Sequence, residues 1–227
     1  MIGSENTTRF CADESTVRLS RSAESIDLTV YENPFPLIAL DVDGVFADSV
    51  LSQMQYMDPL LQDPRITAFE RMYPEYCVYN KDVGGITPFR GHSIRGLVMS
   101  SVLLLIKLAQ NTESMFVLCS SWGVRDEMCE AFEALFQFIS PRDKPYFAGQ
   151  SGFCGGFSRE LEFFGWLESY VPLHWESLSI LAIDDSGSSF FPKMAMEGRL
   201  IAPHGQDLFT SKHYMESFKA LDLPLKF

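Results

Sequence analysis

The residues best suited to chemistry in this chain are two groups of aspartates, Asp41 with Asp43 and Asp184 with Asp185. Asp41 and Asp43 are two positions apart, so their side chains point to the same side of an extended segment. Carboxylates gathered in one place repel each other, which raises their pKa values unless a cation compensates them. Mg2+ prefers such oxygen ligands and commonly keeps waters and a substrate phosphate. The four aspartates therefore predict a Mg2+ site.

A cation held between these acids attracts a phosphoryl group. Asp41 is then the expected nucleophile, which attacks phosphorus to form an aspartyl-phosphate, and Asp43 the expected acid and base. Ser120 follows another apolar segment and is expected to hold phosphoryl oxygens. A positive side chain must also neutralise the transferring group. Arg159 is the first candidate for it and Lys144 the second.

The elements that must position these residues are short apolar strands. Short runs of four to six mostly apolar residues are typical of strands that are buried on both faces of a parallel sheet. A weaker run from Gly198 to Pro203 suggests a further strand. The runs that end at the polar residues are Leu37 to Leu40 before Asp41, Met115 to Cys119 before Ser120, and Leu178 to Ile183 before Asp184.

Helical periodicity fills the intervals between these strands. Ser158 is the expected N-cap of a helix that buries Leu161, Phe164, Leu167 and Tyr170, and the Gly-rich stretch from Gly149 to Gly156 before it is expected to be a loop. The last helix is expected to bury Tyr214, Phe218 and Leu221. The expected helices are Arg95 to Gln110, Val124 to Ile139, Ser158 to Tyr170 and Thr210 to Leu221.

Strands that alternate with helices predict an α/β fold, a three-layer, doubly wound, Rossmann-like parallel sheet. Ligands bind such sheets outside the carboxyl ends of the strands, which brings the polar clusters to one crevice. Residues 34–227 are expected to form this domain, with a small cap inserted at about residues 46–90, where turn signals are frequent. Residues 1–33 lack periodicity and are expected to be a disordered tail.

Three segments resemble motifs of the haloacid dehalogenase-like hydrolases, which are mostly Mg2+-dependent phosphatases. They are LIALDVDGV, FVLCSSW and LSILAIDDS, and the subgroup that looks most similar comprises the haloacid dehalogenase domains of RNA-repair-like proteins. The resemblance implies the same roles for these residues. Asp41 is the nucleophile, Asp43 the acid and base, and Ser120 the phosphate-binding serine. Arg159 or Lys144 is the cation of the family's third motif, and Asp184 and Asp185 bind Mg2+. Gly44, Ser121, Trp122 and Lys144 are further expected to line the substrate site.

The formal net charge of −12 argues against a broad basic surface for nucleic acid or for anionic membranes. The most apolar segment, Leu97 to Ala109, is too short to cross a bilayer. No signal-peptide pattern opens the sequence, and five cysteines without a CxxC pair suggest reduced thiols, so a cytoplasmic location is expected.

Three functions follow from these observations. The first is a phosphomonoester hydrolase that acts on a small phosphorylated metabolite or nucleotide. The second is a phosphatase that processes nucleic-acid ends, which would need a basic groove. The third is a catalytically silent domain that binds a phosphorylated ligand or a protein, and absence of the third-motif cation would favour it.

Overall fold

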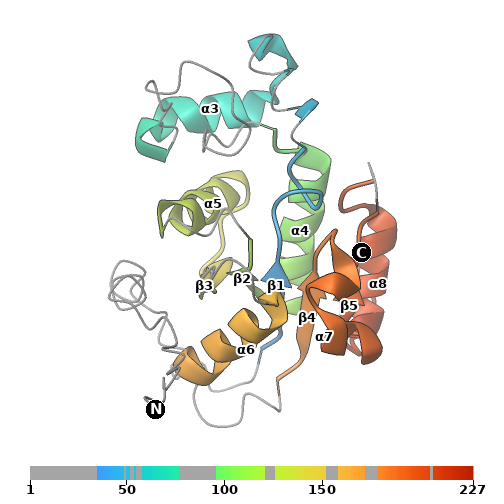
Figure 1. Cartoon of the computed structure of the whole chain (residues 1–227). Helices are drawn as coiled ribbons and strands as arrows, with labels where there is room; N and C mark the ends of the chain where they lie inside the picture. The colour runs from blue at the N-terminus through green and yellow to red at the C-terminus, as the bar shows by residue number, and fades with distance from the viewer. Residues whose placement is uncertain are drawn as a thin grey trace, which may run out of the picture.

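The computed structural model describes residues 35–48, 50–51, 54, 58–76, 96–120, 126–151, 158–171, 178–204 and 207–226. The expected tail, residues 1–33, lies outside this part. Five parallel strands form one sheet in the order β3-β2-β1-β4-β5 (Figure 1). The strands are β1 Leu37–Leu40, β2 Met115–Leu118, β3 Phe147–Gln150, β4 Ile180–Ile183 and β5 Leu200–Ile201.

Six α-helices and three short 3-10 helices accompany the sheet over the described residues. The α-helices are α3 Pro64–Met72, α4 Met99–Thr112, α5 Asp126–Ile139, α6 Arg159–Tyr170, α7 Pro192–Met196 and α8 Ser211–Ala220. The 3-10 helices are η2 Pro59–Leu61, η3 Pro74–Tyr76 and η6 Gly187–Ser189. In this part of the chain, no helix has the length and apolarity that a bilayer crossing requires.

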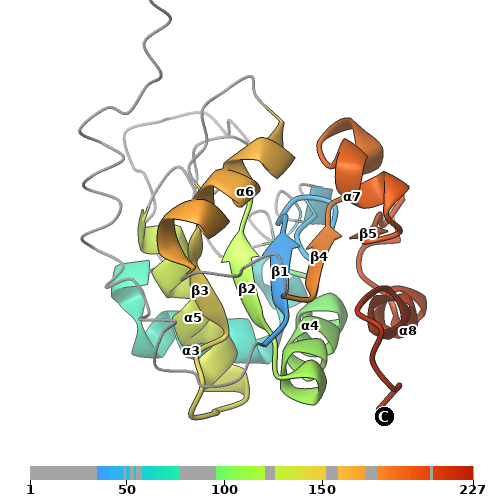
Figure 2. The same cartoon turned by 90° about the horizontal axis from the view of Figure 1, so that it is seen from below.

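The central strand β1 has an apolar core on each of its faces, as its uninterrupted apolar run predicts. Ile38 and Leu40 pack in the cluster that includes side chains of α4, α5 and α8. Leu37 and Ala39 pack in a second cluster with side chains of α6 and α7. Figure 2 shows these two helix layers on opposite sides of the sheet. The expected three-layer α/β architecture with a Rossmann-like parallel sheet is therefore confirmed.

The strand order reverses beside β1. The chain runs outward from β1 to β2 and β3, then crosses back to add β4 on the other side of β1. A crevice forms at such a reversal outside the carboxyl ends of the two strands, and ligands of open α/β sheets bind there. Asp41 follows β1 and Asp184 follows β4, so both lie at this point.

The structure differs from the sequence prediction at β3 and at α6. Phe147–Gln150 is a strand although Gly149 was expected to begin a loop. In α6 the buried apolar residues are Phe163, Trp166 and Leu167, whereas Leu161 is 63% exposed. Apolar residues occur on more than one side of this helix, and packing on the sheet selects the side that is buried.

The segment between β1 and α4 leaves and re-enters the domain at neighbouring points. The Asp48 N–H donates to the Gly96 carbonyl at 2.9 Å, and the Val98 N–H donates to the Phe46 carbonyl at the same distance. Phe46 itself is fully buried and packs edge-on against Phe132 of α5. These hydrogen bonds mark Asp48 as the point where the segment leaves the domain and Gly96 as the point where it returns. Helix α3 lies between these two residues.

Candidate active site

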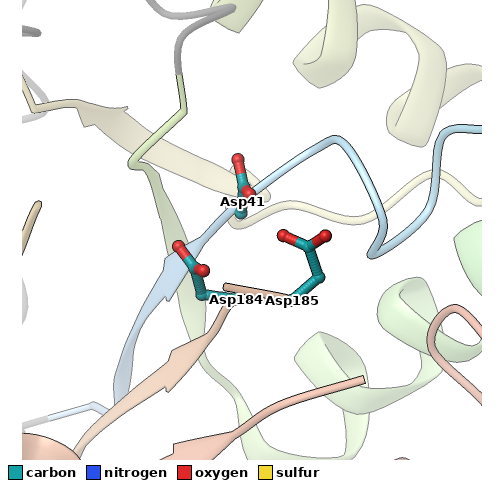
Figure 3. Close-up of side chains that lie close together, drawn as sticks. All are labelled: Asp41, Asp184 and Asp185. Atoms are coloured by element: carbon teal, nitrogen blue, oxygen red, sulfur yellow. The ribbon is translucent and has the colours of Figure 1, made fainter. Parts of the chain in front are cut away.

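Three carboxylates meet where β1 and β4 end. Asp41, Asp184 and Asp185 each have an oxygen within 4.8 Å of the others (Figure 3). Asp41 is 2% exposed and Asp184 is fully buried, while Asp185 is half-buried. Mg2+ binds carboxylate oxygens, and oxygens on opposite sides of the ion are about 4 Å apart. The donor set and its spacing therefore suit a small divalent cation.

A half-buried arginine joins two of these carboxylates. Nη1 of Arg159, at the first position of α6, lies 2.6 Å from Oδ2 of Asp41 and 2.6 Å from Oδ2 of Asp184. The other oxygen of Asp41, Oδ1, is buried and has no hydrogen-bond partner. A buried carboxylate oxygen without a donor is costly. This orphaned oxygen is a second observation that fits a cation ligand or a reacting atom.

Burial and the neighbouring charges together shift the pKa values of the groups in the site. Burial raises the pKa of Asp41 to about 7, the nearby Asp184 adds to the rise, and Arg159 opposes it. Burial likewise raises the pKa of Asp184, again against Arg159. Burial lowers the pKa of the Arg159 guanidinium, but the two aspartates outweigh it, so the net pKa is raised. Arg159 therefore stays charged.

Ser120 and Gly44 lie beside the carboxylates. Ser120 is 3% exposed, follows β2, and its hydroxyl lowers the pKa of Asp41 as a hydrogen-bond partner. Gly44 has φ +69°, and a Cβ built on it would lie 2.2 Å from Oδ2 of Asp185. The glycine is thus explained by a close approach to a carboxylate, and its expected contact with substrate stays a prediction.

The structure brings together Asp41, Ser120, Arg159 and both late aspartates, but not every predicted residue. Asp43 is half-buried and its backbone bridges to Ala47; its carboxylate is not one of the three clustered carboxylates. Ser121 and Trp122 lie outside the described residues. The roles of these residues stay predictions.

Lys144 lies away from the site. It precedes β3, its Nζ donates to the Glu113 carbonyl at 3.3 Å, and it lies over the ring of Phe35, which precedes β1. This is the amino-terminal edge of the sheet, whereas the carboxylates lie at the opposite edge. Lys144 therefore does not supply a cation to the carboxylates, and among the described residues Arg159 is the cation that contacts them.

Two residues that the sequence did not predict contact Arg159 or hold the helix that carries it. The ring of Phe190 lies against its guanidinium, with Cζ 4.5 Å from the ring centroid. Glu160, the next residue in α6, is 5% exposed and accepts hydrogen bonds from the start of α7. An acidic residue in the first turn of a helix usually suggests a solvated side chain, so the sequence held no signal for this burial.

Comparison of the chain with protein-family models, with curated proteins and with solved structures gave no match.

Proposed function

We propose that this protein is a Mg2+-dependent phosphomonoester hydrolase that acts on a small phosphorylated metabolite or nucleotide. The observation that carries the proposal is Nη1 of Arg159 at 2.6 Å from both Asp41 and Asp184, in a cluster that Asp185 completes. The site offers acidic ligands for a divalent cation and a fixed positive charge for a phosphoryl group. Phosphoryl transfer depends on both.

Asp41, Asp184 and Asp185 would hold Mg2+, which when bound neutralises negative charge on the phosphoryl group. Asp41 attacks phosphorus through one carboxylate oxygen, and the ester P–O bond breaks. The leaving oxygen takes a proton from Asp43. In the second step Asp43 removes a proton from water, the water oxygen attacks phosphorus, and inorganic phosphate leaves Asp41.

Arg159 and Ser120 assist this sequence through charge and hydrogen bonds. Arg159 is pre-oriented beside the nucleophile, so it stabilises charge on the phosphoryl oxygens without reorganising. In this proposal Ser120, which lies beside Asp41, donates its hydroxyl to one of those oxygens. Removal of a single donor of this kind typically costs about 100- to 1,000-fold in kcat.

The test is phosphate release from an aryl phosphate and from a panel of nucleoside and sugar monophosphates, with Mg2+ and with EDTA. Wild-type protein should release phosphate only with Mg2+, and Asp41→Asn should lower kcat at least 1,000-fold while circular dichroism shows it folded. Undiminished turnover by Asp41→Asn would exclude the aspartyl-phosphate. If folded wild type binds Mg2+ but releases no phosphate from any substrate, the silent phospho-ligand-binding domain becomes the better reading.

A further inference from the structure

The guanidinium of Arg159 is held by fewer hydrogen bonds than its five N–H groups can make. Nη1 contacts both aspartates, but Nε is buried and has no hydrogen-bond partner. Both contacts lie at one end of the guanidinium, and neither covers its face. A contact on the face holds the plane from a second direction.

The ring of Phe190 makes that contact. Its centroid lies 4.5 Å from Cζ of Arg159, within the range of a cation–π interaction, and the ring is half-buried. We propose that Phe190 is a positioning residue that orients the Arg159 guanidinium between Asp41 and Asp184. Its effect on turnover rests on the proposed function, whereas its effect on Arg159 does not.

The backbone around Phe190 is tied to the residues on both sides of Arg159. The Phe190 carbonyl accepts a hydrogen bond from the Ser158 hydroxyl at 2.8 Å and from the Glu160 N–H at 3.1 Å. The residue that carries the ring is thus bonded to the residues immediately before and after the arginine. These hydrogen bonds fix the backbone of Phe190 relative to the start of α6, which carries Arg159.

Glu160 extends the connection to α7. Its carboxylate accepts hydrogen bonds from the Met194 N–H at 2.7 Å and from the Lys193 N–H at 3.2 Å, at the first turn of α7. Carboxylates are favourable at a helix N-terminus because unpaired N–H groups and the helix dipole are positive there. Glu160 therefore fastens the start of α6 to the segment that follows β4.

The same segment carries Asp184. The Ser186 N–H donates to Oδ1 of Asp184 at 2.8 Å, and the Phe190 N–H donates to the Gly187 carbonyl at 3.1 Å. Asp184 and Phe190 therefore lie at the two ends of one short turn segment, which contains the 3-10 helix η6. The turn presents a carboxylate to Nη1 of Arg159 and an aromatic ring to its guanidinium plane.

The variants that test the proposal keep the turn and change the ring. Phe190→Leu removes the aromatic face, and Phe190→Tyr keeps it. Phe164→Leu is the matched control, because the ring of Phe164 in α6 also lies beside a cation, Nζ of Lys193, at 5.3 Å. Melting temperatures of all three report any general loss of stability.

The first readout is the 1H–15N signal of the Arg159 Nε–H group, assigned by its loss in Arg159→Lys. A ring 4.5 Å away displaces this signal, and burial slows its exchange with water. Removal of the ring changes the shift by itself, so the exchange rate is the test: Phe190→Leu should speed exchange, while Phe190→Tyr and Phe164→Leu leave it as in wild type. The buried Nε of Arg142, elsewhere in the fold, is the internal reference.

The second readout is kcat with the best substrate, which Phe190→Leu should lower about tenfold, with Phe190→Tyr restoring it. An unchanged exchange rate of the Arg159 Nε–H group in Phe190→Leu would overturn the proposal, and so would equally faster exchange in Phe164→Leu. If wild-type protein has no phosphatase activity, the proposed function fails, but the signal of Arg159 still decides whether Phe190 positions it.

Discussion

At the scale of single residues, the site depends on how closely Gly44 approaches Asp185. Gly44 has φ +69°, a conformation that costs other residues about 1–2 kcal/mol. A Cβ at this position would also overlap the Asp185 carboxylate, with 2.2 Å to Oδ2 and 2.4 Å to Cγ. A side chain here therefore has two separable effects, one on the backbone and one on a candidate metal ligand.

Gly44→Ala should weaken Mg2+ binding at least tenfold, because Asp185 must move away from Asp41 and Asp184. Isothermal titration calorimetry with Mg2+ alone measures this. Gly198→Ala is the matched control, since Gly198 has the same φ of +69° and no atom within 4 Å of its Cβ position. If both variants bind Mg2+ as wild type does, Asp185 is not a ligand; equal weakening in both would point to the backbone instead.

The sequence predicted Asp41, Asp184, Asp185 and Ser120 because each follows an apolar strand, and parallel strands end at one edge of their sheet. It ranked Arg159 ahead of Lys144 by position alone, since both are single cations near a predicted helix or turn. The structure separates them by placing Lys144 at the opposite edge of the sheet. Phe190 and Glu160 gave no signal, because their roles depend on how α6 packs against the turn after β4.

At the scale of elements, the strands with four or more apolar residues in a row were predicted, and β3 was not. Phe147–Gln150 contains a glycine and a glutamine, and it is covered partly by Phe132 and Phe136 of α5. Packing against other elements thus stabilises a strand in a segment whose own β propensity is low. The same reason explains α6, where the buried side differs from the predicted one.

The last helix, α8, makes a prediction about pH. His213 is 7% exposed, and its Nδ1 accepts a hydrogen bond from the N–H of Thr210, the N-cap. Burial lowers the pKa of His213, although Glu216 opposes the shift. The unfolded state therefore binds the proton more tightly. The stability that neutral His213 contributes is present above the unfolded pKa of about 6.5 and is lost as pH falls through it towards the lower folded pKa.

His213→Gln keeps an acceptor for the N-cap N–H but removes this titration. The free energy of unfolding of wild type minus that of His213→Gln should therefore decrease between pH 7.5 and pH 5.5. Urea unfolding at both pH values measures the difference, and subtraction cancels contributions from the aspartates. A difference that stays constant, or that grows at low pH, would show that His213 is not held neutral in the folded state.

At the scale of the whole molecule, the candidate site joins β1 to β4 at the centre of the sheet. Each of these strands has a neighbour on both sides, so a ligand there is linked to global unfolding rather than to fraying of an edge. A cation that binds only the folded state stabilises it by about 2.7 kcal/mol at one hundred times its Kd. For a domain of this size, that is about 5–10 °C in Tm.

Saturating Mg2+ should therefore raise the Tm of wild-type protein, and Asp185→Asn should lose most of the rise. Glu216→Gln is the control, because it removes one negative charge from an exposed position on α8, where Glu216 pairs with Lys212 at 3.9 Å. The control matters in a chain with a net charge of −12, whose surface attracts any divalent cation. An equal rise in all three proteins would mean that Mg2+ binds this diffuse negative surface, and the carboxylates at the strand ends would then need another explanation, such as the charge balance of Arg159.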